Sequence, residues 1–151
     1  MNDYKDYSQA AKICAKFEGL RLQAYQDIVG IWTIGYGTTF YPDGTKVKQG
    51  DTCTVEQATE WLEIILDRFS KDIRKYITVE LRKNQWEALL VLIYNIGPTN
   101  FSKSTLRKTI NTNPDSLDIA ENWTRFIKAG GKNNRGLLRR RLYEAYHYFS
   151  W

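Results

Sequence analysis

Apolar residues near the start of the chain recur at the three- and four-residue spacing of a helix. Ala11, Ile13, Cys14 and Phe17 follow Ser8, a residue type that often caps a helix N-terminus. Gly19 favours the left-handed conformation that ends many helices. This pattern predicts a short helix that begins with Ser8 as its N-cap and ends at Glu18.

Residues 20–50 change to short apolar stretches separated by glycines. The turn sequence Tyr41-Pro42-Asp43-Gly44 lies among them, and the five glycines are Gly30, Gly35, Gly37, Gly44 and Gly50. Short apolar runs bounded by turn residues are typical of strands. We expect a small antiparallel sheet of two or three strands.

A long helical pattern begins at Thr54. Thr54 and Gln57 have the spacing of a capping box. Apolar residues then repeat every three or four positions at Ala58, Trp61, Leu62, Ile65, Phe69, Ile73, Tyr76 and Ile77. The pattern predicts one helix to about Ile77, which can join two lobes and form the back of a cleft.

The remaining residues predict further helices. Residues 82–96 are apolar nearly all round, as expected for a helix at the centre of a lobe that stops at Gly97-Pro98. Three more helices are predicted at about 104–110, 114–128 (capped by Asn113) and 136–149, with a loop over 129–134.

These elements predict an α+β fold in a single domain, residues 1–151. A small N-terminal lobe, about 1–53, carries the first helix and the short antiparallel sheet. The connecting helix spans about 54–80, and a larger all-helical lobe spans about 81–151.

Composition narrows the class of protein. The chain has 151 residues, 42% hydrophobic and 26% charged, a balance typical of soluble globular proteins. Its longest apolar run, Ala88 to Tyr94, is too short for a bilayer, which needs about 20 residues. The polar N-terminus lacks the pattern of a secretory signal. We expect no membrane insertion.

Cysteine and histidine are scarce. Cys14, Cys53 and the single histidine, His147, lack the spacing of a zinc site. We therefore expect no metal and no cofactor. In a reducing compartment the two thiols are expected to be unpaired core residues.

Two carboxylates and a hydroxyl stand out as candidate catalytic groups. Glu18 lies at the predicted helix end, Asp27 nine residues on in a turn, and Thr33 on the predicted second strand. The negative end of the helix dipole and burial in a cleft would both raise the pKa of Glu18, as a general acid requires. Taken singly, each residue is more simply explained as a solvated, turn or strand residue, so the residues alone give only weak support for a catalytic site.

The residues around these three form a pattern that resembles the active-site signature of phage lysozymes, glycoside hydrolase family 24. The matching stretches are Phe17-Glu18-Gly19-Leu20-Arg21-Leu22, Ala24-Tyr25-Gln26-Asp27 and Gly30-Ile31-Trp32-Thr33-Ile34-Gly35-Tyr36-Gly37. The resemblance implies a lysozyme-like fold and Glu18, Asp27 and Thr33 as the catalytic set. Gly35 and Gly37 lack side chains, so a sugar ring can approach that backbone closely, although hairpin geometry explains them too.

The resemblance continues through most of the chain. Similar stretches are residues 50–58, 85–97, 101–106 and 136–144. Within the last, Arg140 takes the position implied to face and brace the catalytic glutamate. In isolation, the basic cluster of Lys132, Arg135, Arg139, Arg140 and Arg141 is typical of either a solvated face or a nucleic-acid patch, and the net charge of +5 favours a polyanionic partner without choosing one. With this signature present, we expect attraction to the anionic bacterial wall and no nucleic-acid partner.

The chain departs from the family pattern at two points. Thr38 replaces a histidine that many members carry, which puts a local salt bridge in doubt. The chain also lacks the N-terminal signal-arrest-release helix of some members. It therefore resembles members that stay in the host cytoplasm until a holin releases them to the peptidoglycan of the periplasm. We expect a monomer.

Three functions compete. The first is an N-acetylmuramidase that hydrolyses the β-1,4 bond between N-acetylmuramic acid and N-acetylglucosamine with inversion, Glu18 acting as the acid and Asp27 with Thr33 holding water. The second is a lytic transglycosylase, which needs only the glutamate. The third is a catalytically inactive binding module that uses its basic face.

Overall fold

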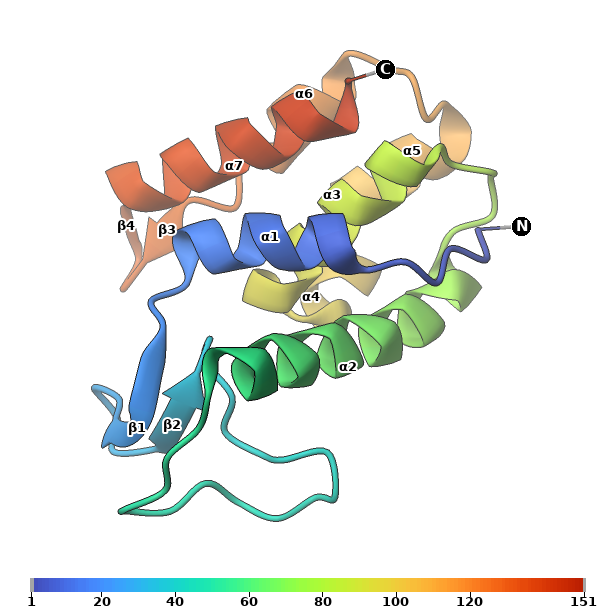
Figure 1. Ribbon diagram of the computed structural model, residues 1–151. Coiled ribbons are helices and arrows are strands. Elements are labelled where there is room, and N and C mark those ends of the chain that lie inside the picture. The colour runs from blue at the N-terminus through green and yellow to red at the C-terminus, as the bar shows by residue number, and fades with distance from the viewer. Residues whose placement is uncertain (1, 151) are drawn as a thin grey trace. The chain divides into compact units, whose positions relative to one another are not determined.

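The computed structural model describes residues 2–150, which form two compact units. The sheet unit comprises residues 7–68, and the helical unit comprises residues 2–6 together with 69–150. Figure 1 labels the elements of both. The first helix belongs to the sheet unit, whereas the residues before it belong to the helical unit, where the Asn2 side chain bonds the backbone of Val79 and Leu81.

Helix α1 (Ser8–Phe17) buries the predicted apolar face, with Ala10, Ala11, Ile13 and Cys14 in the core. The prediction of its caps was wrong at both ends. Tyr7, not Ser8, precedes the helix as N-cap and makes no side-chain capping bond. At the other end Glu18 itself turns to extended backbone, with φ −89° and ψ 133°, so no left-handed glycine is needed and Gly19 does not supply one.

The small sheet has two antiparallel strands, β1 (Arg21–Gln26) and β2 (Trp32–Gly35). Tyr25 pairs with Thr33 and Gln26 with Trp32, and the register is irregular between Arg21 and Tyr25. Isolated bridges extend the pairing outside the strands and join Gln23 to Thr52, Ile34 to Thr38 and Phe40 to Lys46. The predicted sheet is confirmed in its two-stranded form.

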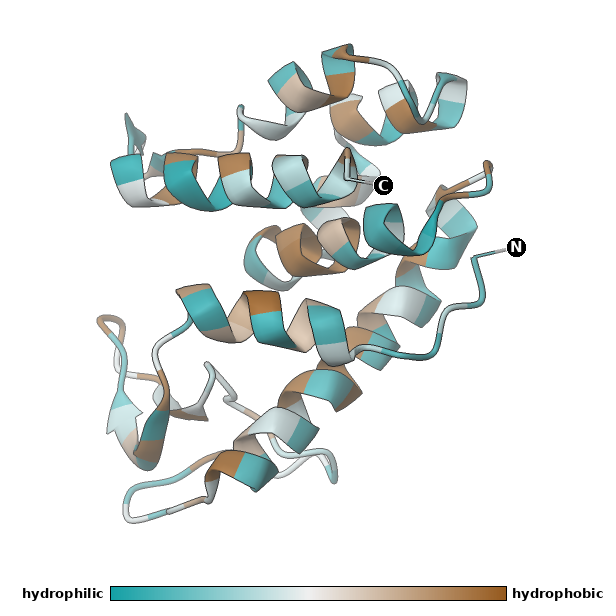
Figure 2. Ribbon diagram, turned by 45° about the horizontal axis from the view of Figure 1, so that its top comes forward, coloured by the Kyte–Doolittle hydropathy of each residue, from teal (hydrophilic) through white to brown (hydrophobic). Residues whose placement is uncertain are grey.

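Helix α2 (Val55–Ile73) is the long helix that the apolar repeat predicted. The capping box is present: Thr54 Oγ1 accepts from the Gln57 backbone at 3.1 Å, and Gln57 Oε1 accepts from the Thr54 backbone at 2.9 Å. Apolar and polar residues alternate along it in Figure 2. The α-helix is shorter than predicted because residues Arg74–Tyr76 tighten into a 3-10 turn, η1.

Helix α3 (Lys83–Ile96) is the core of the helical unit. Nine consecutive residues from Gln85 to Ile93 are buried, as the nearly uniform apolar sequence predicted. The Trp86 indole donates to Ser70 Oγ at 2.9 Å, so its polar atom is satisfied in the core. Gly97, with φ +85°, ends the helix and allows the sharp turn before Pro98.

The C-terminal elements differ most from the prediction. This part of the chain contains four helices, α4 (Pro98–Ser102), α5 (Thr105–Thr112), α6 (Asp118–Trp123) and α7 (Arg135–Tyr148). Two short strands, β3 (Lys128–Ala129) and β4 (Lys132–Asn133), lie between α6 and α7. The helix predicted over 114–128 is thus reduced to six residues, and the lobe is not purely helical. Asn113 does not cap the start of a helix over 114–128: it is the C-cap of α5, and its side chain accepts from the Asp115 backbone in a turn.

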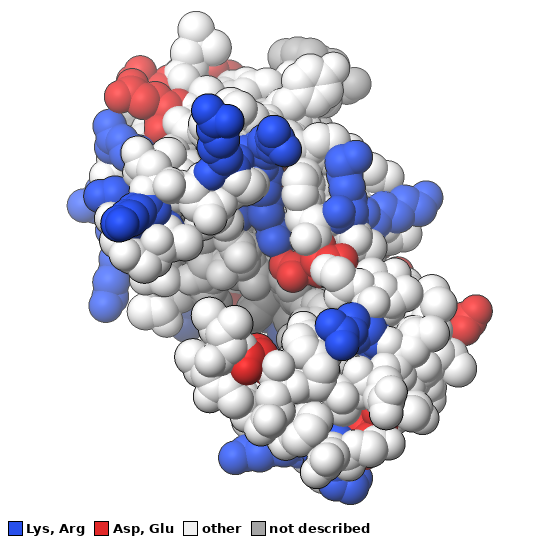
Figure 3. Space-filling view, turned by 90° about the vertical axis from the view of Figure 1, so that its left-hand side faces the viewer, with Lys and Arg blue, Asp and Glu red and all other residues white. Residues whose placement is uncertain are grey.

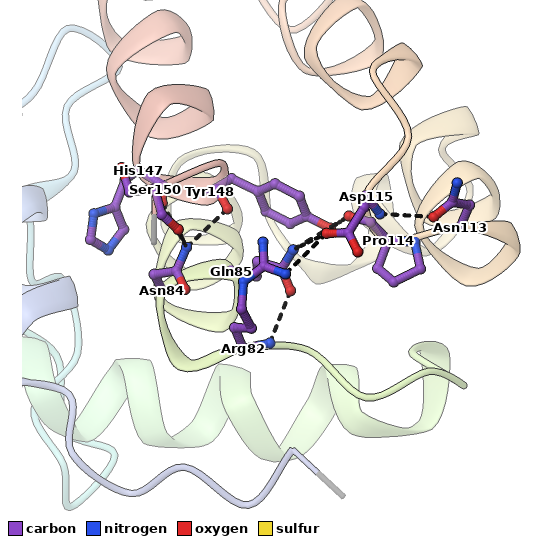
Figure 4. A network of polar contacts seen from close by, with 9 residues as sticks. All are labelled: Arg82, Asn84, Gln85, Asn113, Pro114, Asp115, His147, Tyr148 and Ser150. Atoms are coloured by element: carbon purple, nitrogen blue, oxygen red, sulfur yellow. Dashed lines mark hydrogen bonds and ion pairs between the residues drawn. The ribbon is translucent and has the colours of Figure 1, made fainter.

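A polar network holds the C-terminal end of α7 to the start of α3 (Figure 4). The Asn84 side chain donates to the carbonyls of His147, Tyr148 and Ser150. The Tyr148 hydroxyl donates to the Pro114 carbonyl at 2.7 Å. The Asn84 bonds fix the end of α7 against α3, the helix with which it packs, and the Tyr148 bond joins it to the segment between α5 and α6.

In the described part of the chain, residues 2–150, no helix is both long and apolar enough to span a membrane. Cys14 and Cys53 are not joined to each other. Cys14 is buried as expected, but Cys53 is partly exposed, and its partial burial raises its pKa.

Candidate active site

Glu18 is placed by the end of α1. Its backbone N–H donates to the Cys14 carbonyl at 2.8 Å, which completes the last turn of the helix. The change to extended backbone at Glu18 then directs the chain into β1. The side chain is half-buried. A carboxyl group in this position is held by rigid secondary structure and still reaches solvent, as a proton donor must.

Asp27 shapes the turn between β1 and β2. Its Oδ1 accepts hydrogen bonds from the backbone N–H groups of Val29 and Ile31, each at 2.9 Å. Its own backbone N–H donates to the Ile31 carbonyl, and its carbonyl accepts from Gly30. Because these side-chain bonds use Oδ1, the other carboxylate oxygen, Oδ2, is the one available to a water or a substrate.

Thr33 lies on β2 and is almost fully buried, with 5% of its surface exposed. Its hydroxyl donates to the Ile31 carbonyl at 3.0 Å. With its proton committed to that carbonyl, the hydroxyl oxygen can accept a hydrogen bond from a water. Asp27 and Thr33 therefore both bond to Ile31, Asp27 through the backbone N–H and Thr33 through the carbonyl.

Chemically, the sheet unit holds one half-buried carboxyl group at a helix end and a second carboxylate that accepts two backbone hydrogen bonds in a tight turn. Glycosidic hydrolysis uses two carboxyl groups, one as the acid and the other as the base or nucleophile.

The two glycines that follow Thr33 have different surroundings. Gly35 is buried with φ +66°, and a Cβ there would lie 3.1 Å from the Cβ of Ala58 on α2. The close packing against α2 and the positive φ both favour glycine at this position. Gly37, with φ +93°, is exposed. Thr38 is buried at 7% exposure, and its backbone pairs in both directions with Ile34.

Arg140 lies in the helical unit and is 5% exposed. Its Nε donates to Glu144 Oε2 at 3.1 Å, and Arg141 Nε lies 3.3 Å from the other oxygen of the same carboxylate. The Trp123 indole also donates to Glu144. Burial raises the pKa of Glu144, and the two arginines oppose that shift. Arg140 is thus one member of a buried charge cluster on α7.

Sequence reasoning missed how the hairpin turn is built. The two backbone bonds to Asp27 follow from an Asp that precedes a Gly by three residues, which was recognised only as a turn signal. It also missed the stacking of the Arg21 guanidinium over the Tyr25 ring, 4.4 Å from its centroid. Tyr25 pairs with Thr33, so this stack lies next to the candidate residues.

Among residues 2–150 no three His, Cys, Asp or Glu side chains are grouped so that they could hold a metal ion.

Known proteins resemble the chain over most of its length. The family model described as Phage lysozyme matches residues 15–144. An endolysin of Acyrthosiphon pisum secondary endosymbiont phage 1 is 38% identical over 133 residues, which cover 85% of this chain and 87% of that protein.

Solved structures agree. An endolysin from the Escherichia coli O157:H7 phage FAHEc1 superposes with a TM-score of 0.85 at 36% identity, covering 94% of this chain and 91% of the other. The muramidase domain of SpmX from Asticaccaulis excentricus gives a TM-score of 0.84 at 27% identity, covering 95% and 96%. The chain therefore belongs to the phage lysozyme family, a family of glycoside hydrolases that cleave peptidoglycan.

Proposed function

We propose that this lysozyme hydrolyses the β-1,4 bond between N-acetylmuramic acid and N-acetylglucosamine, with Glu18 as the general acid. Glu18 protonates the leaving glycosidic oxygen as the bond breaks. The position of this carboxyl group at the rigid end of α1, half-buried and still accessible, supports the role.

Asp27 and Thr33 hold the attacking water on the opposite face of the sugar. The observation that carries this assignment is that both residues are anchored to Ile31, one by its N–H and one by its carbonyl. The anchoring leaves Asp27 Oδ2 and a lone pair of Thr33 Oγ1 as two acceptors. A water that donates to both would have its own lone pair left for the anomeric carbon.

This arrangement favours inversion of configuration. A water between base and sugar requires carboxyl groups separated by about 6.5–9.5 Å, whereas a retaining enzyme places them about 5 Å apart. A water-holding pair such as Asp27 and Thr33 has no role in a direct nucleophilic attack by a carboxylate. NMR of the first product formed would show the α-anomer; a β-anomer as first product would contradict the proposal.

Arg140 is proposed to support the catalytic acid, the role that its position in the family pattern implies. The Glu144 cluster fixes the Arg140 side chain. Gly37 is proposed to let a sugar ring approach the exposed backbone after β2. An Arg140→Lys variant would shift the acid limb of the pH–rate profile if the first role is right.

The experiment that tests the function compares lysis by wild type and Glu18→Gln. The turbidity of outer-membrane-permeabilised Gram-negative cells should fall with wild type, and the rate of this fall should be at least about a hundredfold lower with Glu18→Gln. Glu60→Gln, an exposed glutamate of α2 in the same unit, is the matched control and should lyse like wild type. Full lysis by Glu18→Gln would refute the assignment of the acid.

A lytic transglycosylase remains the alternative reaction. Such an enzyme forms an internal anhydro sugar and needs no water, so Asp27 and Thr33 would have no catalytic task. Mass analysis of the fragments distinguishes the two reactions by one water, 18 Da.

We further propose that the enzyme acts as a monomer and waits in the host cytoplasm until a holin opens the inner membrane.

A further inference from the structure

Charge is divided unequally between the two units. The helical unit holds 16 of the 22 Lys and Arg residues and 9 of the 17 Asp and Glu residues, a net charge of +7. Figure 3 looks at the side of the molecule where β3, β4 and the start of α7 lie in Figure 1, and shows Lys and Arg side chains gathered there. The sheet unit, with the other 6 cations and 8 anions, has −2 and holds Glu18, Asp27 and Thr33. An anionic part of the substrate beside these residues therefore gains from a local cation of the sheet unit.

Arg21 is a cation that the sheet places beside them. Tyr25 pairs directly with Thr33, and directly paired residues of antiparallel strands have their side chains on the same face. The Arg21 guanidinium lies over the Tyr25 ring, 4.4 Å from its centroid. The stack of Arg21 on Tyr25 is therefore next to a residue that is proposed to hold the attacking water.

The irregular register of β1 brings Arg21 to this position. Arg21 pairs with Gly35 and Tyr25 with Thr33, so four steps along β1 match only two along β2. In a regular strand, residues four apart are separated by about 13 Å, whereas two steps along the partner strand span about 7 Å. Extra residues in one strand bend it and redirect its side chains. The bend therefore shortens the distance that the Arg21 side chain must cross to reach the Tyr25 ring.

The Arg21 side chain is exposed, and its N–H groups remain available to a ligand. Within the described chain, residues 2–150, the guanidinium makes no ion pair or hydrogen bond in addition to the stack. A guanidinium over an aromatic ring keeps its N–H donors at its edges, where they can bind a carboxylate through two parallel hydrogen bonds. Lys48 of the same unit, by contrast, already pairs with Asp51.

We propose that Arg21 binds a carboxylate of the N-acetylmuramic acid residue whose glycosidic bond is cleaved. It thereby favours muramyl substrates over glycans of N-acetylglucosamine alone, which carry no carboxylate. The proposal rests on the proposed function, in which Asp27 and Thr33 hold the water that attacks carbon 1 of this sugar.

The carboxylate has two possible sources on the same sugar. The lactyl group on carbon 3 ends in a carboxylate when no peptide stem is attached, and a stem that is attached brings carboxylates of its own. The Cβ atoms of directly paired residues such as Tyr25 and Thr33 are about 5 Å apart. A substituent of the sugar that meets the water at Thr33 can therefore reach a guanidinium that lies over Tyr25.

The test measures binding without turnover, in the Glu18→Gln background. Tryptophan fluorescence gives dissociation constants for glycan strands freed of their stems by an amidase and for the same strands with their lactyl carboxylates converted to carboxamides. The carboxylate strands should bind about three- to tenfold more tightly, as expected for one exposed charge contact. Stem-bearing strands are compared with their amidated form in the same way. A preference in the stripped strands assigns the lactyl carboxylate to Arg21, and a preference in the stem-bearing strands alone assigns a carboxylate of the stem.

Arg21→Gln should abolish the preference and leave the affinity for amidated strands unchanged, and Arg21→Lys should restore part of the preference. The matched control is Lys46→Gln, which removes another exposed cation of the sheet unit that lies over an aromatic ring, 5.9 Å from the centroid of Phe40. The control should keep the preference.

Two results would overturn the proposal. One is equal affinity of the Arg21 protein for carboxylate and amidated strands, in both the stripped and the stem-bearing form. The other is an equal loss of affinity for carboxylate and amidated strands in Arg21→Gln, because it would show that Arg21 only supports the sheet.

Failure of the proposed function would be recognised separately. Wild type that hydrolyses none of the strands, while the carboxylate preference is present, would leave the assignment of Arg21 in place and refute the muramidase. Wild type that hydrolyses carboxylate and amidated strands with equal KM would do the reverse.

Discussion

Asp27 performs two tasks with its two oxygens. Oδ1 holds the turn through the N–H groups of Val29 and Ile31, and Oδ2 is proposed to hold water. The first task requires only an acceptor, which an asparagine also provides. The second requires negative charge close to the reacting sugar. The two tasks can therefore be separated by substitution.

We expect Asp27→Asn to unfold near the wild-type temperature while losing most of its lytic activity. Asp27→Ala should lose activity equally and also lose about 1–2 kcal/mol of unfolding free energy, because two backbone donors lose their partner. Urea unfolding and turbidity assays on both variants provide the comparison. Equal stability of the two variants would show that the turn does not depend on Oδ1.

Gly35 shows how a single methyl group can test packing. Gly35→Ala meets both an unfavourable backbone conformation, φ +66°, and a Cβ contact of 3.1 Å with Ala58. Gly44→Ala meets a similar conformation, φ +89°, with nothing within 4 Å. We expect about 1 kcal/mol of destabilisation at Gly44 and about 2–4 kcal/mol at Gly35. Equal losses in thermal unfolding would mean that α2 moves to accommodate the methyl group.

Among the elements, the loop between β2 and α2 depends on one carboxylate. Asp51 Oδ2 accepts from the Tyr41 hydroxyl at 2.7 Å and from the Lys48 backbone at 3.1 Å, while Oδ1 lies 3.1 Å from the Lys48 ammonium. The hydrogen bond from Tyr41 is the main reason that the pKa of Asp51 is lowered. The Asp51 backbone carbonyl also accepts from Ala24, so the loop and β1 are held together.

Stability should therefore depend on the ionisation of Asp51. A carboxyl group whose pKa is lower in the folded than in the unfolded state stabilises the fold at pH values above the unfolded pKa, about 3.9. That contribution is lost as the pH falls through the lower, folded pKa. Unfolding midpoints measured in urea from pH 5 to pH 2 should fall less steeply for Asp51→Asn than for wild type. Parallel curves would exclude Asp51 as a contributor.

Element types were predicted well where the apolar period was long. Helices α2 and α3 follow directly from their repeats, and the capping box at Thr54 fixes the start of α2. Prediction failed between residues 114 and 134, where the helix is short and a hairpin of two-residue strands replaces the expected loop. Gly130 and Gly131, with φ +59° and +78°, form the turn of that hairpin, and α6, which ends at Trp123, contacts α5 and α7.

For the whole molecule, the opposite net charges of the two units have a measurable consequence. Attraction between the helical unit, at +7, and an anionic wall is screened by salt beyond a Debye length of about 8 Å at 0.15 M. We expect kcat/KM on cell walls to fall severalfold between about 0.05 M and 0.5 M salt. Hydrolysis of an uncharged chitooligosaccharide serves as the control and should change little. An equal fall on both substrates would point to a salt effect on the active site itself.

The sequence by itself determined the family and the order of the main helices and the two-stranded sheet. Glu18, Asp27 and Thr33 are proposed as catalytic from the spacing of the family signature, and the local elements that carry them, a helix end, a tight turn and a strand, are encoded by neighbouring residues. Only the tertiary structure decided what surrounds them. Side-chain packing and directed hydrogen bonds are not specified by a repeat of apolar residues. They decide that Gly35 faces Ala58, that Asp27 and Thr33 share Ile31, and that Glu144 holds Arg140.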